Sequence, residues 1–414
     1  MIVDNGIFTQ MQTNAWQAAS GQCYGLPCAV TMGDIRSHIS KYIDICGWNP
    51  KKTHVLCDEN TVHLMAQDIA ALYHLNITIL PKDVKPSMQV IEKLVKELRG
   101  QNVNAIVAVG SGTVNDIAKM ASFMLGGEYG IVATAPSMNG YLSANASVID
   151  HGVRVSRSAH MPKHIWMDIN ILLEAPAYLI ASGVGDSLSR TTAQADWLLS
   201  HVVLNTHYNS DIFEMQLPYE MHVFDHVEKL LKGDSNIMIS LAKLLLLSGY
   251  GMTLAGSSAP ASGGEHMIAH VLDMAGCSAK QRLTHGIQIA VTTLAMSRIQ
   301  QKQVEELLDR HITVPDFNSQ GLEALLSDEQ LKACKGAYEE KAALFAQKGC
   351  ALVSEANIKA IKQVMLCVDV LEDVASRVGL KNKPQDIGWQ TKAFNQAIKG
   401  ARFTRNRWTF LDIA

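Results

Sequence analysis

The sequence predicts a Rossmann-like α/β domain with a parallel sheet, followed by an all-helical domain. Short apolar runs alternate with helical patterns between about residues 50 and 170, which is typical of a doubly wound parallel sheet. After residue 176 helical periodicity recurs with almost no strand-like alternation. The 414 residues also exceed what one core usually fills, about 250–300 residues. We therefore expect an N-terminal domain at 1–175 and a helical domain at 176–414.

Composition narrows the functional classes. The net charge of −3 gives no basic field of the kind that nucleic-acid binders use. The most apolar segment, 239–255, is interrupted by Lys243 and glycines, so we expect a buried helix and no membrane partner. Eight cysteines include no C-x-x-C pair, which favours reduced thiols and a cytoplasmic protein. The N-terminal segment lacks the pattern of a signal peptide.

The N-terminal domain is expected to begin with an extension or edge element at 1–50, which includes a short helix at 34–45. Apolar runs that end in turn-forming or capping residues then predict five strands with helices between them. The expected strands are 53–57, 77–80, 105–109, 130–134 and 164–167, and the expected helices are 62–73, 88–98 and 117–125.

A glycine-rich turn follows the third of these strands. It runs from Gly110 through Ser111, Gly112, Thr113 and Asn115 to Asp116. Glycines between a strand and a helix let backbone amides approach an anion, and the helix N-terminus adds its positive dipole end. We interpret this turn as a phosphate cradle for a nucleotide. Because Asn115 occupies the third glycine position of G-x-G-x-x-G, the pattern fits a plain tight turn equally well.

Two other positions in this domain are candidate cofactor contacts. Thr134 and Ser137 belong to a loop of turn-forming residues at 135–140 that can line a nicotinamide pocket or be an ordinary surface loop. Asp58 follows the first clear strand and can bind the adenosine ribose hydroxyls, which would favour NAD over NADP. The alternative for Asp58 is a carboxylate in a solvated turn.

The second half of the chain is predicted to be helical throughout. The periodic segments are 191–203, 224–231, 237–255, 265–274, 286–301, 304–309, 322–326, 328–345 and 357–378. Small-molecule sites often lie between domains, and the glycine-rich turn falls before the predicted boundary while the histidines described next fall after it.

A candidate metal site involves residues of this helical half. His266 and His270 are four residues apart, so they share one helix face, and His285 can reach the same place from the next element. Asp186 follows two glycines just inside a predicted helix. Two imidazoles, one carboxylate and an open position suit a catalytic divalent cation. We expect Asp186, His266 and His285 to hold it, although buried histidines are also common as hydrogen-bonded core residues.

Two neighbours of these ligands have predicted supporting roles. His270 is free to relay a proton or to orient the substrate, and the alternative is that it packs and hydrogen-bonds within its helix. Glu265 faces a different way from its neighbour on the helix, so it is expected to form a salt bridge or hydrogen bond beside the metal ligands and not to bind the metal itself.

The order of these motifs resembles that of the metal-dependent polyol dehydrogenases related to glycerol dehydrogenase and dehydroquinate synthase, and within them the sn-glycerol-1-phosphate dehydrogenases. The resemblance covers roughly residues 50–414. It is carried by Gly110–Lys119, Thr134–Tyr141, Gly183–Ser187 with Ala195–Trp197, Ser262–His266, His285–Gly286 and Arg405–Asp412.

The resemblance implies a dehydroquinate synthase-like fold, NAD or NADP, and one divalent metal, zinc, iron or nickel. The cofactor would be held by the glycine-rich turn with Thr134 and Ser137, and the metal by the three ligands named above. It also implies reduction of dihydroxyacetone phosphate to glycerol 1-phosphate. The chain departs from the family pattern at Asn139 and Asn406, where aspartate is usual, and at Arg190, where lysine is frequent.

We expect an enzyme that acts on a small molecule, and homo-oligomers are compatible with the sequence. Arg405 and Arg407 are candidates for a substrate phosphate or plain surface charges, and Asn139 and Arg190 are further candidate substrate contacts. One alternative is a dehydrogenase or reductase of an unphosphorylated polyol or another small anionic carbonyl compound, such as a phosphonoaldehyde. A sugar-phosphate cyclase on the same scaffold ranks third, since it should require more basic side chains near the motifs.

Overall fold

The computed structural model describes residues 16–413 except 18–19, 27, 44–46, 151–152, 278–282, 309, 315, 320 and 350–351. The chain forms two compact units. One unit comprises residues 1–180 and 214–250, and the other comprises 181–213 and 251–414. The predicted division into domains at residue 175 remains a prediction.

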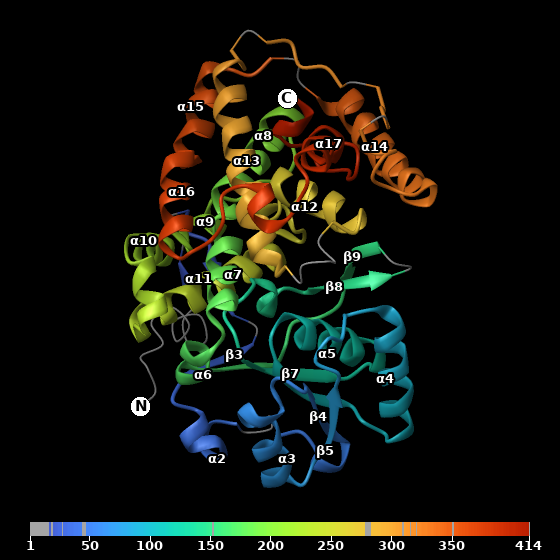
Figure 1. Ribbon diagram of the computed structural model, residues 1–414, viewed down its shortest axis with the longest axis vertical. Helices are drawn as coiled ribbons and strands as arrows, with labels where there is room; N and C mark the ends of the chain where they lie inside the picture. Colours follow the sequence, from blue (N-terminus) through green and yellow to red (C-terminus); the bar gives the residue numbers. More distant parts are fainter. Residues whose placement is uncertain are drawn as a thin grey trace. The chain divides into compact units, whose positions relative to one another are not determined.

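A six-stranded parallel sheet organises the first unit (Figure 1). Its strand order is β3-β10-β7-β6-β4-β5, so the α/β prediction is confirmed. The strands are β3 (Ala29–Gly33), β4 (Thr53–Asp58), β5 (Asn76–Leu80), β6 (Ala105–Gly110), β7 (Glu128–Ala133) and β10 (His164–Asp168). The carboxyl ends of β4, β6 and β7 carry Asp58, Gly110 and Thr134, which is the edge where ligands of such sheets bind.

Both faces of this sheet are buried. Val55 and Cys57 of β4 pack with Val107 and Val109 of β6 in a cluster that includes α3 (Gln67–Tyr73). The alternate residues point to the opposite face, where α4 (Met88–Gly100) and α5 (Gly112–Leu125) lie (Figure 1). Burial on two faces explains why these strands read as continuous apolar runs instead of alternating patterns.

Three predictions in this unit need correction. The helix after the glycine-rich turn starts at Gly112 instead of 117. Within 1–50, residues 29–33 form edge strand β3, and the helix expected at 34–45 is reduced to a 3₁₀ turn, Arg36–His38, and α2 (Ile39–Tyr42), while 44–45 lie outside the described residues. The antiparallel pair β8 (Asn145–Asp150) and β9 (Val153–Ser158) was not predicted.

Helix α11 (Ser235–Ala255) has the length and composition of a membrane span. In its most apolar window 78% of the residues are buried within the protein, as in a core helix. Gly249 illustrates the close packing, because a Cβ there would lie 2.1 Å from the carbonyl oxygen of Asn139. The remaining helices of this unit are α6 (Ile169–Glu174), α10 (Leu217–Asp225) and the 3₁₀ helix Val227–Lys232.

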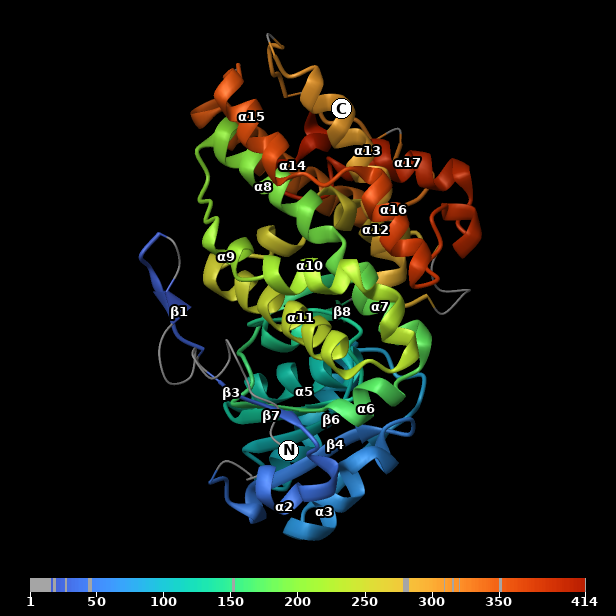
Figure 2. The same cartoon turned by 90° about the vertical axis from the view of Figure 1, so that its left-hand side faces the viewer.

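The second unit is helical. Helices α8 (Ser189–Leu204), α12 (Gly264–Met274) and α13 (His285–Glu305) pack against one another (Figures 1 and 2). The other helices are α7 (Ala177–Ser187), which begins in the first unit, α9 (Asp211–Glu214), α14 (Asp328–Lys348), α15 (Glu355–Val364), α16 (Val368–Arg377) and α17 (Thr391–Ala401). The single helix expected at 357–378 is two helices, and 322–326 is a turn.

A side chain from another helix explains why α15 and α16 are separate. The Thr191 hydroxyl donates to the carbonyl oxygen of Val364 (2.9 Å) and accepts from the amide of Leu366 (2.8 Å). Those two backbone groups would otherwise bond within a continuous helix. The break is therefore satisfied by a tertiary contact that helical periodicity cannot predict.

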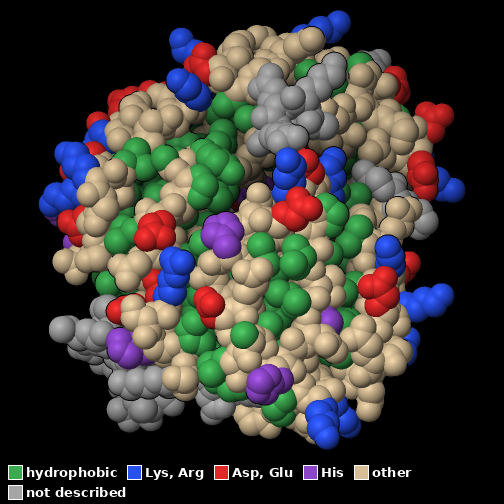
Figure 3. Space-filling model, turned by 60° about the horizontal axis from the view of Figure 1, so that its bottom comes forward, with side chains coloured by type: hydrophobic (Ala, Val, Ile, Leu, Met, Phe, Trp, Pro, Cys, Tyr) green, Lys and Arg blue, Asp and Glu red, His purple; other side chains and the backbone are tan. Residues whose placement is uncertain are grey.

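The surface carries mixed charge. On the face shown in Figure 3, Lys and Arg side chains are interspersed with Asp, Glu and apolar side chains among the residues coloured there. No extended basic patch covers that face of the described chain, which agrees with the net charge of −3.

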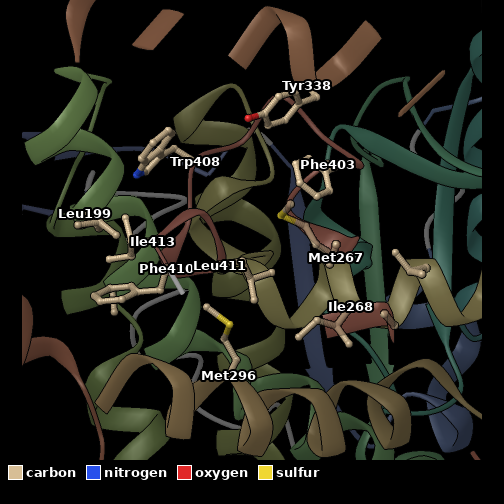
Figure 4. Close-up of a cluster of buried hydrophobic side chains, with 14 of the residues drawn as sticks. Leu199, Met267, Ile268, Met296, Tyr338, Phe403, Trp408, Phe410, Leu411 and Ile413 are labelled. Carbon is tan, nitrogen blue, oxygen red and sulfur yellow. The ribbon is translucent and has the colours of Figure 1, made fainter. Parts of the chain in front are cut away.

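The C-terminal turn is part of the core of the second unit. Figure 4 shows Trp408, Phe410, Leu411 and Ile413 in one cluster with Met267 and Ile268 of α12 and Met296 of α13. The buried ion pair between Lys341 and Asp412 (2.5 Å) anchors the same turn. The end of the described chain therefore packs against the helices that carry the candidate metal ligands.

Candidate functional site

The structure brings together the three predicted metal ligands, all within the second unit. Asp186 is on α7, His266 on the first turn of α12, and His285 at the start of α13. The Nε2 atoms of His266 and His285 are each 3.9 Å from Asp186 Oδ1. Asp186 and His266 are buried, whereas about a third of the His285 side chain is exposed. The cluster can therefore be reached from one side.

Glycines next to the ligands allow this convergence. A Cβ at Gly185 would lie 2.2 Å from the carbonyl oxygen of Gly286, and a Cβ at Gly286 would lie 1.7 Å from that of Ser182. The Gly286 amide also donates to the Ser182 hydroxyl (3.1 Å). Only glycine permits such close backbone approach. The G-x-G-D and H-G motifs thus have a packing reason, since they bring Asp186 and His285 side by side.

Glu265 orients one of the two imidazoles. Its Oε1 lies 2.9 Å from His266 Nδ1 and accepts from the amide of Gly263 (2.5 Å), while Oε2 accepts from the Thr192 hydroxyl (2.8 Å). Burial alone would raise the pKa of Glu265, but its hydrogen bond to His266 and the charge of that imidazole outweigh burial and lower the pKa. With Nδ1 held in this way, His266 presents Nε2 toward Asp186.

The donor set fits a divalent transition metal. The three ligand atoms lie within 4.8 Å of one another. Ligands about 2.1 Å from a tetrahedral ion would be about 3.4 Å apart, so a small inward movement would complete the set. Two imidazole nitrogens and one carboxylate oxygen suit zinc, iron or nickel. His270 lies beside this set, with its ring centroid 6.2 Å from that of His266 and 6.4 Å from that of His285.

The glycine-rich turn in the first unit has the geometry of an anion cradle. Strand β6 ends at Gly110 and helix α5 starts at Gly112, and the intervening Ser111 makes no side-chain cap. The first-turn amides of α5 have no intrahelical acceptor and are available to a phosphate. A Cβ at Gly110 would lie 2.5 Å from Val114 Cβ, so this glycine is needed for the tight strand-to-helix turn.

Two charged residues fix the elements around this turn. Lys119 is buried, and its Nζ donates to the carbonyl oxygens of Gly140 (2.7 Å), Ser143 (2.7 Å) and Asn145 (3.1 Å). It thereby holds α5 against the loop that follows Ser137. The pKa of Asp116 is raised to about 6, chiefly by burial, although the positive charges of Lys119 and Arg154 oppose the shift.

The other cofactor candidates surround the turn within this unit. The Thr134 amide donates to the carbonyl oxygen of Gly110 (3.1 Å), and Thr134 and Ser137 are buried. Asp58 Oδ1 accepts from the amides of Asn60 (3.0 Å) and Thr61 (2.9 Å), so this carboxylate caps its own turn. That geometry is the alternative to a ribose contact, and the ribose role remains a prediction.

Comparisons with known proteins show which families and relatives the chain is similar to. Residues 34–176 match the family model described as iron-containing alcohol dehydrogenase. A glycerol-1-phosphate dehydrogenase of Thermococcus sibiricus is 33% identical over 54% of this chain and 64% of its own length. One from Thermococcus kodakarensis is 29% identical over 67% of this chain and 78% of its own length. The chain thus spans less than two thirds of the first of these relatives.

A solved structure shows the same fold. An iron-containing alcohol dehydrogenase from Corynebacterium glutamicum superposes with a TM-score of 0.62 over 93% of this chain and 90% of its own, at 12% identity. Residues 34–176 therefore resemble the iron-containing alcohol dehydrogenase family, and the chain has the fold of that solved structure. Its similarity to the glycerol-1-phosphate dehydrogenases confirms the resemblance read from its motifs.

Three of the four predicted substrate contacts, Asn139, Arg190 and Arg407, have hydrogen-bond partners within the protein. Asn139 donates to the Ser248 hydroxyl (3.1 Å), and Arg190 donates to Gln194 on the same helix (2.5 Å). Arg407 donates to the Ser262 carbonyl oxygen and to the Ser258 hydroxyl (2.8 Å). The substrate roles of Asn139, Arg190, Arg405 and Arg407 remain predictions.

One buried carboxyl was not given a role by sequence reasoning. Asp196 accepts hydrogen bonds from the amides of Gly264 (2.7 Å) and Phe410 (2.9 Å) and from the Gln300 side chain (3.0 Å). Burial, and then the charge of Glu265, raise the pKa of Asp196 to about 8. A Cβ at Gly263 would lie 2.5 Å from Asp196 Oδ2. Gly263, the first glycine of the S-G-G-E-H motif, is therefore required for this close packing. Its partner Asp196 belongs to the A-D-W motif, so that motif is the sequence signal from which this contact could have been found.

Proposed function

We propose that this chain is a metal-dependent, NAD(P)-linked dehydrogenase that interconverts dihydroxyacetone phosphate and sn-glycerol 1-phosphate. The observation that carries the proposal is the convergence of Asp186, His266 and His285 within 4.8 Å, in a chain whose residues 34–176 match the iron-containing alcohol dehydrogenase family model. The relatives named as glycerol-1-phosphate dehydrogenases support the substrate and the use of NAD or NADP.

The site residues have distinct proposed roles. A divalent cation bound there would polarise the substrate oxygen and stabilise the alkoxide. Asp186 supplies the anionic ligand, His266 and His285 supply neutral nitrogen ligands, and Glu265 fixes the tautomer of His266 by accepting from Nδ1. His270, one turn after His266, is the imidazole that we assign to exchange of the hydroxyl proton.

The cofactor would be held by the first unit. The amides at Gly112 and Thr113 on the first turn of α5 suit the pyrophosphate, together with the hydroxyl of Ser111. Thr134 and Ser137 lie at the same carboxyl edge of the sheet, where a nicotinamide would extend from that pyrophosphate. The free cysteines Cys28, Cys57, Cys277, Cys334 and Cys367 support the proposed cytoplasmic location.

Turnover of metal-depleted and reloaded protein tests this function. We would remove metal with a chelator, restore zinc, iron or nickel separately, and follow oxidation of NADH and NADPH. Dihydroxyacetone phosphate is expected to be reduced only after one of the metals is restored. Dihydroxyacetone, glyceraldehyde and phosphonoacetaldehyde should be poorer substrates. Equal turnover of dihydroxyacetone would contradict the phosphorylated substrate, and turnover without metal would contradict the mechanism.

A matched pair of variants locates the activity. Asp186→Asn removes the anionic ligand and should lower kcat/KM by about 100-fold or more. Asp68→Asn makes the same chemical change on the exposed surface of α3 and should leave it unchanged. If both variants keep full activity while the protein binds metal, the ion is held elsewhere.

A further inference from the structure

A pair of histidines lies at the carboxyl end of α10, within the first unit. His222 is in the last turn of this helix and His226 is its C-cap. Their ring centroids are 5.4 Å apart, with an interplanar angle of 71°. Side chains four residues apart share one face of a helix. His222 is exposed and His226 is partly exposed, so an ion can reach this face from solvent.

A hydrogen bond determines which nitrogen of His226 remains for a ligand. Its Nδ1 lies 3.2 Å from the carbonyl oxygen of His222. A carbonyl oxygen only accepts, so Nδ1 of His226 carries the proton and donates it. In the neutral imidazole the other nitrogen, Nε2, then carries the lone pair. Nε2 is the atom through which such an imidazole binds a metal.

A chain of hydrogen bonds assigns the proton of His222 in the same way. Its Nδ1 lies 2.8 Å from the hydroxyl of Ser240 on α11, the helix beside α10 (Figures 1 and 2). That hydroxyl donates its single proton to the carbonyl oxygen of Asn236 (3.0 Å). The Ser240 oxygen therefore accepts from Nδ1 of His222. As in His226, the lone pair is on Nε2.

The spacing of the two rings suits a shared ion. Two imidazoles that bind a tetrahedral ion through nitrogen at about 2.1 Å would have ring centroids about 5.3 Å apart. The 5.4 Å separation at α10 agrees with this value. At the candidate catalytic metal site, the rings of His266 and His285 are 5.2 Å apart. An acceptor beside Nδ1 also orients His266 there, so the two sites share their arrangement of imidazoles.

We propose that His222 and His226 bind a divalent transition-metal ion through their Nε2 atoms, with water in the remaining positions. Imidazole ligands suit copper, nickel and zinc, whereas magnesium and calcium require oxygen ligands. Because Ser240 of α11 orients His222, an ion bound here stabilises the contact between α10 and α11. This site lies outside the unit that carries the candidate catalytic ligands and does not rest on the proposed function.

Nickel titration of the metal-free full chain tests the proposal. Two imidazoles on one helix make the second coordination intramolecular, which raises affinity about 100-fold or more over a single imidazole. Calorimetry should therefore show one nickel equivalent that is lost in both His222→Gln and His226→Gln. Nickel should raise the Tm further in the unmodified protein than in either variant. Copper should bind more tightly than nickel, and magnesium should not compete.

Two other variants separate this site from general binding at surface imidazoles. His63→Gln is the matched control, because His63 is exposed and has no second histidine four residues away; it should keep the equivalent. Ser240→Ala removes the acceptor for Nδ1 of His222 while alanine preserves the helix. It should weaken nickel binding about tenfold. An equal loss in His63→Gln and His222→Gln would overturn the proposal, because any surface imidazole would then suffice.

The number of nickel ions distinguishes this site from the catalytic one. If both sites bind nickel, the unmodified protein will take up two ions per chain and His222→Gln one. If only the catalytic site of the proposed function fails, these numbers will be one and zero. One ion in both proteins would overturn the site on α10 and leave the proposed function intact.

Discussion

The role of Glu265 leads to a graded prediction for metal affinity. Glu265→Ala removes the acceptor for His266 Nδ1, the Gly263 amide and the Thr192 hydroxyl. Thr192 also donates to the Ser189 carbonyl oxygen (3.1 Å), so two buried donors lose their partner. At about 1–3 kcal/mol for each, we expect the free energy of unfolding to fall by about 2–6 kcal/mol.

The same loss should weaken metal binding. Outer partners of ligating histidines typically contribute 10–100-fold in affinity, and about 1.4 kcal/mol corresponds to each tenfold change. Glu265→Gln retains an oxygen for His266 and Gly263 and can donate to the Thr192 hydroxyl, but it removes the negative charge. We expect about tenfold weaker binding for Glu265→Gln and about 100-fold for Glu265→Ala.

Competition with a chelating dye would measure these affinities. The visible absorption of the cobalt-substituted protein would report ligand geometry, which a purely structural role of Glu265 would not alter. Glu339→Gln is the control, because Glu339 is exposed in a surface ion pair with Lys335 and should have no effect. Metal affinity within twofold of the unmodified protein in Glu265→Ala would refute this reasoning.

Three further changes probe the packing and charge of the fold. Gly263→Ala should destabilise the protein by about 1–3 kcal/mol through overpacking against Asp196. Gly336 has open space around it on α14, so Gly336→Ala should raise the free energy of unfolding by about 1 kcal/mol. Denaturant unfolding measures both changes. Lys341→Met leaves the Asp412 carboxylate buried without its partner and should cost about 3–5 kcal/mol, seen as a lower denaturation midpoint. The pKa of Asp116 is raised from 3.8 to about 6 in the folded protein. Between these pH values the Asp116 carboxyl is therefore protonated in the folded state and ionised in the unfolded state. Stability of the cofactor-free protein should fall by up to about 3 kcal/mol as pH rises through that window, and a pH series of unfolding curves for Asp116→Asn should lack this slope.

The sequence by itself determined the kind of fold and the kind of site. Apolar runs at 53–57 and 105–109 with helical patterns between them suffice for a parallel sheet, because period and length are local properties. The i,i+4 spacing of His266 and His270 and the glycine before Asp186 indicated a metal site, because ligand chemistry depends on residue type.

Only the tertiary structure decided what depends on contacts between distant segments. Edge strand β3 exists because it pairs with β10, and the break between α15 and α16 is satisfied by Thr191. Glycines at 185 and 286 bring Asp186 beside His285, and Asp196 joins three elements around α12. Such contacts leave no periodic trace in the sequence, because each depends on a backbone or side-chain approach that forms only when the chain has folded.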